Sequence, residues 1–108
     1  MPTSLTIPSA LILDAILSGR CHGFDIMDAT GLPSGTVYPA LRRMEKEGWI
    51  VSRWEDERIS LQEQRPARRY YAITAEGEAA LAEARRRYRV LQHAGIVNPK
   101  AQHGGSNA

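Results

Sequence analysis

The spacing of apolar residues changes at Gly48, and this change limits the folds that the chain can adopt. Before Gly48, apolar residues recur three and four positions apart, which predicts helices over about 6–18, 23–29 and 35–47. After it, residues alternate in period two over Trp49–Glu55, and Arg69–Thr74 is rich in aromatic and β-branched residues. These two runs predict an antiparallel pair of strands. Helical spacing then returns from Thr74 to about His93.

Residues suited to helix ends stand at the expected boundaries. Thr6 precedes a proline in the first turn of the first helix, and Gly31 and Gly48 stand where the second and third helices end. Ser34 is placed to cap the third helix. The residues expected to face inward from these helices are Leu11, Ile12, Ala15, Ile16, Phe24, Met27, Val37, Leu41 and Met44.

The segment between the two strands, Asp56–Ala67, is polar and contains Pro66. It predicts a loop that is long for a hairpin, and loops of this length are often functional or mobile. Trp49 and Trp54, at the two ends of the first strand, are expected to fill the core beneath the paired strands.

Three helices followed by a two-stranded wing is the winged helix-turn-helix arrangement, whose third helix can enter a DNA major groove. We therefore expect a mostly α fold with a small two-stranded antiparallel wing and one long C-terminal helix. On this basis residues 1–74 form the DNA-binding domain, 75–95 a C-terminal dimerisation helix and 96–108 a flexible tail.

Composition argues against several classes of protein. The 108 residues suit one domain, and no apolar run approaches the ~20 residues that span a bilayer, so we expect no membrane contact. The N-terminus, Met1–Ile7, lacks the basic stretch and apolar region of a signal peptide, so we expect a cytoplasmic protein. A single cysteine, Cys21, cannot form an internal disulfide or a multi-thiolate zinc site. No phosphate-binding loop or nucleophile-base spacing points to an enzyme, a cofactor or a metal. The net charge is +2, and all but two of the 14 basic residues are arginine, which suits phosphates and base edges.

Three blocks of the sequence are similar to those of one known protein family. The block His22-Gly-Phe-Asp-Ile26 is similar to the one that opens the family's second helix. Residues 35–50, Gly-Thr-Val-Tyr-Pro-Ala-Leu-Arg-Arg-Met-Glu-Lys-Glu-Gly-Trp-Ile, resemble its recognition helix and the entry to the wing, and the pair Tyr38-Pro39 is the most specific feature. Residues 68–77, Arg-Arg-Tyr-Tyr-Ala-Ile-Thr-Ala-Glu-Gly, resemble its returning strand and the start of the helix that follows. With these three blocks the chain resembles the PadR family of winged-helix transcription regulators. The stretch 22–35 is several residues shorter than is common in the family, and the single last helix resembles the short-tailed branch.

The resemblance implies a homodimeric repressor that binds an inverted repeat in double-stranded DNA, with the third helix in the major groove and the wing on the backbone or minor groove. The candidate DNA contacts are Ser34, Thr36, Tyr38, Arg42, Arg43, Arg65, Arg68 and Arg69. A three-four-three spacing in the last helix is typical of a seam between helices. The residues of this expected dimer seam are Leu81, Ala84, Tyr88 and Leu91.

The same residues leave alternatives open. Tyr38 could pack on the wing, the arginines could be solvated surface charges, and the seam from Leu81 to Leu91 could pack against its own domain. A small aromatic effector could stack between Trp49 and Trp54 at the dimer interface, which would make the repressor ligand-responsive. The chain could also be a protein-interaction module without DNA affinity.

Overall fold

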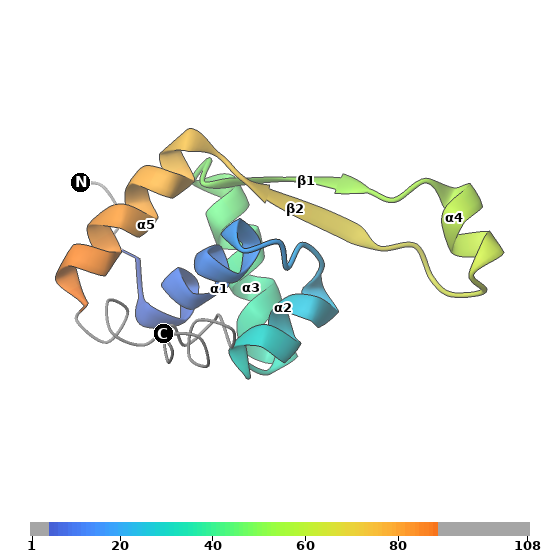
Figure 1. Ribbon diagram of the computed structural model, residues 1–108, viewed down its shortest axis with the longest axis horizontal. Coiled ribbons are helices and arrows are strands. Elements are labelled where there is room, and N and C mark those ends of the chain that lie inside the picture. The colour runs from blue at the N-terminus through green and yellow to red at the C-terminus, as the bar shows by residue number, and fades with distance from the viewer. Residues whose placement is uncertain (1–4, 89–108) are drawn as a thin grey trace, which may run out of the picture.

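The computed structural model describes residues 5–88, and within them the chain forms five helices and two strands. In chain order these are α1 (Ile7–Leu17), α2 (Gly23–Thr30), α3 (Ser34–Lys46), β1 (Ile50–Trp54), α4 (Glu57–Gln62), β2 (Arg69–Ile73) and α5 (Ala75–Arg87). The first three helices form a cluster, α5 lies on one side of it, and the β1–β2 hairpin projects away with α4 at its far end (Figure 1). We call β1, α4 and β2 the wing. The winged helix-turn-helix prediction is therefore confirmed.

The core is built around α1. This helix contacts α2, α3, α5 and β2, and it is apolar on most sides, as expected for a helix with neighbours all round. It has 11 residues, and no helix within residues 5–88 is long and apolar enough to cross a membrane. The largest fully buried side chains are Ile12, Leu13, Ile26, Val37, Leu41, Met44, Ile50 and Leu81. They confirm the three inward positions predicted for the third helix, at 37, 41 and 44.

Most of the predicted helix ends are confirmed. The Thr6 side chain accepts a hydrogen bond from the Ser9 amide at 3.2 Å and so caps α1. Gly31 and Gly48 follow α2 and α3 with φ of 74° and 82°. Only glycine adopts this left-handed conformation without steric cost, so these two residues end their helices where the sequence predicted.

α3 begins at Ser34, so the prediction that Ser34 caps this helix is wrong. Pro33 holds the cap position instead, and its carbonyl accepts a hydrogen bond from the Val37 amide at 3.0 Å. Pro39 lies inside α3 without ending it. A proline ring presses on the carbonyl of the residue four positions earlier, here Gly35, and the missing proline amide removes one hydrogen bond of the helix.

β1 and β2 pair antiparallel, with Ile50 opposite Ile73 and Trp54 opposite Arg69. The even-numbered residues of β1 share one face of the hairpin, as the alternation predicted. Only the part of this face next to the helices is covered, because the strands extend beyond them (Figure 1). Ile50 is buried and Trp49 packs partly against the core, but Trp54 is 64% exposed. The prediction that Trp54 fills the core is wrong.

The segment between the strands is not an irregular loop throughout, because α4 forms at the tip of the wing. The Asp56 side chain accepts a hydrogen bond from the Arg58 amide at 2.9 Å and caps this helix. A helix of six residues is too short to show an apolar repeat, so sequence periodicity predicted only a loop.

Phe24 also departs from its predicted inward position, since it is 74% exposed. α2 buries the side that carries Ile26, and Phe24 lies two residues, or about 200°, around the helix from it. Met27, the other residue predicted to face inward here, does pack against the core. The Phe24 side chain is therefore available at the surface beside α3.

Candidate nucleic-acid interface

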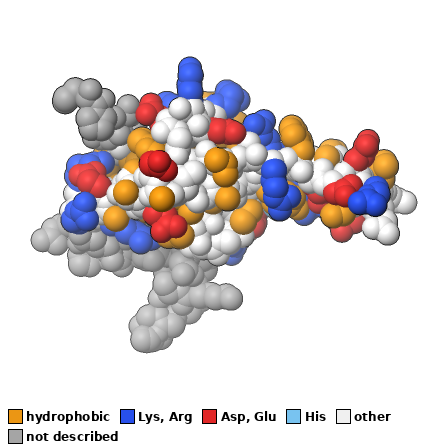
Figure 2. Space-filling model, turned by 90° about the horizontal axis from the view of Figure 1, so that it is seen from above, with side chains coloured by type: hydrophobic (Ala, Val, Ile, Leu, Met, Phe, Trp, Pro, Cys, Tyr) orange, Lys and Arg blue, Asp and Glu red, His pale blue; other side chains and the backbone are white. Residues whose placement is uncertain are grey.

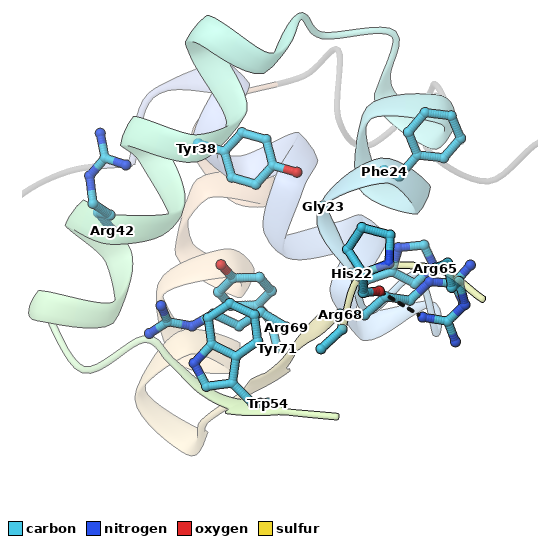
Figure 3. Close-up of a pocket in the computed structure, with 12 residues that line it drawn as sticks. His22, Gly23, Phe24, Tyr38, Arg42, Trp54, Arg65, Arg68, Arg69 and Tyr71 are labelled. Atoms are coloured by element: carbon cyan, nitrogen blue, oxygen red, sulfur yellow. Dashed lines mark hydrogen bonds between the residues drawn. The ribbon is translucent and has the colours of Figure 1, made fainter. Parts of the chain in front are cut away.

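A groove of about 650 Å³ lies between the start of α2, the exposed side of α3 and the part of the wing where β1 ends and β2 begins (Figure 3). We call it the α3–wing groove. Its lining, as far as residues 5–88 provide it, is aromatic and basic and contains no acidic side chain. The lining residues are His22, Gly23, Phe24, Tyr38, Arg42, Trp54, Arg65, Pro66, Ala67, Arg68, Arg69 and Tyr71. Clustered cations with flat apolar surfaces are typical of sites for nucleic acid.

α3 supplies one basic wall of this groove. Arg42 lines it, and the exposed Arg43 and Lys46 continue the basic surface further round the helix. Adjacent helical residues differ by about 100°, so Arg42 and Arg43 face different directions. The opposite side of α3 is fixed in the core, and its basic side is therefore held outward.

The other residues predicted as DNA contacts on α3 occupy its first turns. Ser34 is exposed at the first helical position, and Thr36 is partly buried on the same side of the helix as Arg43. Both side chains carry hydroxyl groups that can bond to phosphate or to base edges.

Tyr38 lies between α3 and α2, with its hydroxyl directed toward Gly23 (Figure 3). A Cβ atom at Gly23 would stand 2.2 Å from the Tyr38 hydroxyl oxygen, so only glycine leaves room for this ring. Tyr38 remains exposed on its groove side. Gly23 of the His22-Gly-Phe block thus leaves the space that the Tyr38 ring of the Tyr38-Pro39 pair occupies.

Arg69 is held on the inner face of the wing by three neighbours. Its Nε donates to the Ser52 hydroxyl at 3.0 Å, its Nη2 donates to Glu45 of α3 at 3.4 Å, and its guanidinium lies 5.6 Å from the Trp54 ring centre. The Ser52 hydroxyl also donates to Glu45 at 2.8 Å. These contacts link the wing to α3 and fix the direction of Arg69.

Arg65 lies on the side of the groove opposite Arg42 (Figure 3). Its Nη1 and Nη2 donate to the two oxygens of Glu55 at 2.8 and 2.7 Å, and its Nε donates to Glu63 at 2.9 Å. These bonds raise the pKa of the Arg65 guanidinium. Arg68 has its side chain in the groove lining, while its backbone amide donates to Glu55. Arg65 is thus paired inside the wing, and Arg68 is directed to the groove.

Acidic side chains surround the tip of the wing (Figure 2). Asp56, Glu57 and Glu63 are exposed there, against one exposed arginine, Arg58. Such a surface repels phosphates, whereas the wing residues that line the groove at the start of β2 include Arg68 and Arg69.

His22 and Cys21 lie between α1 and α2 near the groove. The His22 and Tyr70 rings are perpendicular, with their centres 5.8 Å apart. Burial is the main cause that lowers the pKa of His22, and the positive charge of Arg68 adds to it. The Cys21 thiol donates to the Gly19 carbonyl at 3.3 Å. Within residues 5–88 no group of three His, Cys, Asp or Glu side chains is placed to hold a metal ion.

Comparison with known proteins decides the family. Residues 12–83 match the model of the Transcriptional regulator PadR-like family. This chain belongs to the PadR-like family. Its members are transcriptional regulators and not enzymes, as the sequence predicted. No curated protein matches the chain.

Solved structures agree with the PadR-like assignment. A PadR family transcription regulator from hypervirulent Clostridium difficile is 27% identical, with a TM-score of 0.67, and the match covers 83% of this chain and 95% of that one. A transcriptional regulator from Clostridium thermocellum is 25% identical, with a TM-score of 0.63 and coverage of 79% and 82%. A Streptococcus mutans protein is 25% identical, with a TM-score of 0.66 and coverage of 90% and 93%.

In this PadR-like chain, the predicted dimer seam lies largely inside one protomer. Leu81 and Ala84 are 2% and 0% exposed because they face α1 and the rest of the core. The Tyr88 hydroxyl donates to the Leu5 carbonyl at 3.0 Å. Leu91 lies outside the described residues. Leu81 and Ala84 therefore have no free surface to offer a second chain.

Sequence reasoning missed three residues of the PadR-like groove and its surroundings. Phe24 and Trp54 were predicted to be core residues but line the groove, and Glu55 was given no role. An aromatic residue in an amphipathic pattern favours burial, and nothing in the pattern marks where the covered surface ends. The order of the residues could not show that Glu55 and Arg65 meet, because α4 lies between them.

Proposed function

We propose that this PadR-like chain is a homodimeric, sequence-specific DNA-binding repressor of an inverted-repeat operator. The observation that carries the proposal is the α3–wing groove, where Arg42 of α3 and Arg68 and Arg69 of the wing line a single acid-free surface. A DNA backbone can run along this groove when α3 enters the major groove and the start of β2 meets the neighbouring phosphates or minor groove.

Arg42 and Arg43 are the proposed sequence-reading residues. A guanidinium can donate two hydrogen bonds to one guanine edge, and such a contact discriminates against the wrong base by ~1–3 kcal/mol. Their different directions on α3 allow contacts with neighbouring bases, or with a base and a phosphate. Arg68 and Arg69 are proposed to bind phosphates or a narrow minor groove.

The homodimer is proposed to form through α5 and the residues that follow it. With Leu81 and Ala84 in the protomer's own core, the free side of α5 carries the exposed Ala75, Ala79 and Ala82. Small side chains at spacings of four and three allow a second helix to approach closely. Two-fold pairing through this side would set the distance between the two copies of α3, which must match half-sites ~34–36 Å apart.

A charged side chain on this face tests the dimer. Ala82→Arg is expected to give a monomer in sedimentation equilibrium, because the long charged side chain would keep the two helices apart and would be buried between them. The circular dichroism melt should stay within a few degrees of wild type, since Ala82 is exposed. Ala72→Arg, at an exposed alanine of β2, is the matched control and should remain dimeric. A dimeric Ala82→Arg protein would place the interface elsewhere.

The function itself is tested by selecting genomic DNA fragments that bind the purified chain, and by placing the selected site before a reporter gene. A repressor lowers reporter output from a promoter that contains the site, and an operator with two-fold symmetry yields an inverted repeat in the selected fragments. Failure to enrich any fragment would favour the alternative of a protein-interaction module without DNA affinity.

A further inference from the structure

The most enclosed charged contact of the wing lies at its neck, where β1 ends and the returning chain enters β2. The Glu55 side chain is only 4% exposed and the Arg65 side chain 20% exposed, although both belong to a hairpin that projects from the body. The two are joined by two parallel N–H···O bonds, the arrangement in which arginine binds a carboxylate most strongly.

Glu55 accepts further hydrogen bonds from the returning chain. The Tyr70 hydroxyl donates to Oε2 at 3.3 Å, and the Arg68 backbone amide donates to Oε1 at 3.2 Å. The Glu55 amide in turn donates to the Arg68 carbonyl at 2.8 Å. These bonds hold the pKa of Glu55 down, at about 2, with the Arg65 guanidinium as the largest cause. Glu55 is therefore hydrogen-bonded twice to the backbone of Arg68. Its carboxylate accepts from the Arg68 amide, and its own amide donates to the Arg68 carbonyl.

We propose that Glu55 and Arg65, which we call the neck clasp, position Arg68 for DNA and do not contact DNA themselves. The inference rests on the DNA-binding function proposed above. Arg65 was predicted as a phosphate contact, but its Nη1, Nη2 and Nε atoms are all bonded to carboxylates of the wing. Moving Arg65 to a phosphate would leave the carboxylate of Glu55 buried without its main partner, which is costly.

The clasp also explains how an exposed hairpin can present a side chain in a fixed direction. Between Glu55 and Arg65 the chain leaves the strand pairing to form α4, and the last backbone hydrogen bond across the hairpin is the one from the Glu55 amide to the Arg68 carbonyl. The Glu55 and Arg65 side chains join the two ends of this segment a second time. Arg68 follows three residues after Arg65, and its place in the groove lining depends on that second connection.

The two roles of Arg65 make opposite predictions for Glu55. If Arg65 contacts phosphate, Glu55→Gln removes a negative charge near DNA and releases Arg65, so affinity should rise or stay unchanged. If the clasp positions Arg68, the same substitution should lower affinity about tenfold. It should also reduce the slope of log affinity against log salt concentration by about one unit, since the Arg68 phosphate contact is lost.

Fluorescence anisotropy with a duplex from the promoter region of the chain's own gene can measure both quantities. Glu63→Gln is the matched control, because it removes the same charge from an exposed partner of the same arginine, 2.9 Å from Nε. We expect the Glu63→Gln variant to bind the duplex with wild-type affinity. Arg68→Ala added to Glu55→Gln should cause no further loss, because both act on one contact.

Arg65→Lys provides a second test that does not depend on how well Glu55→Gln folds. It preserves the charge and loses the paired geometry, so a positioning role predicts a loss like that of Glu55→Gln, whereas a simple phosphate contact predicts near-wild-type affinity. Tight binding by either variant, or an additive loss from Arg68→Ala, overturns the proposal. If wild-type protein itself binds no duplex, the DNA-binding function fails and the clasp proposal falls with it.

Discussion

Replacing both Arg42 and Arg43 by alanine is expected to reduce operator affinity by at least about thirtyfold and to leave the fold and the dimer intact. Each arginine is expected to supply one base or phosphate contact of ~1–3 kcal/mol, and two such losses reach this magnitude. Both side chains are exposed on α3, so the core keeps its packing and the circular dichroism melt should not change. Fluorescence anisotropy on the selected operator measures the loss.

The control for this double variant removes the same charge from the wing. Arg53 lies over the Tyr70 ring on the outer face of the hairpin, and Arg58 lies on α4, both outside the α3–wing groove. Alanine at both positions should change affinity by less than about threefold, through the loss of long-range attraction only. Equal losses from the two double variants, or wild-type affinity without Arg42 and Arg43, would remove α3 from its proposed role.

Gly77→Ala is expected to cause the largest loss of stability of any single methyl group added to a described glycine. A Cβ atom at Gly77 would stand 2.1 Å from the Trp49 carbonyl oxygen and 2.7 Å from an Ile73 side-chain atom. The carbonyl is backbone at the start of the wing and cannot rotate away, so α5 must shift from the core. Overpacking of this kind costs about 3 kcal/mol, which lowers the melting temperature by roughly 12–24 °C in a domain of this size.

Gly35→Ala is the matched control, because it adds the same methyl group to another helix. No atom lies within 4 Å of a Cβ built at Gly35, so the methyl group meets no neighbour. Alanine forms helices better than glycine, and the melting temperature should stay level or rise, with a gain of up to about 1 kcal/mol. Melting of Gly77→Ala at the wild-type temperature would show that α5 does not lie against the wing as described.

The sequence predicted those parts of the fold that depend on local repeats and on helix ends. Val37, Leu41 and Met44 repeat at helical spacing, and each is buried, while Gly31 and Gly48 end their helices in the left-handed conformation. Helical burial and glycine conformation are properties of a few neighbouring residues, so a single sequence contains them.

What the sequence could not supply was the identity of the surface that covers an apolar face. The spacing of Leu81 and Ala84 marks a buried side of α5, but the same spacing serves a second chain or the protomer's own α1. Phe24 and Trp54 were predicted to be buried but are exposed, because nothing covers the parts of α2 and β1 that carry them.

The candidate site was predicted in part for the same reason. Arg42 and Arg43 follow directly from the helical face of α3 and are exposed as expected, and Arg68 and Arg69 line the groove. Arg65 is an arginine beside the wing like Arg68 and Arg69, so the sequence does not distinguish it from them. Its paired hydrogen bonds to Glu55 depend on the path of the chain through α4. Their roles in DNA binding stay predictions until affinity is measured.

The salt dependence of binding to the selected operator tests the central claim most directly. The two proposed phosphate contacts per chain, from Arg68 and Arg69, predict that log affinity falls against log salt concentration with a slope near −1.8 per chain, since each phosphate contributes ~0.9. Any phosphate contact by Arg42 or Arg43 would make the slope steeper, up to about −3.6 per chain. A flat response over the same salt range would contradict the account.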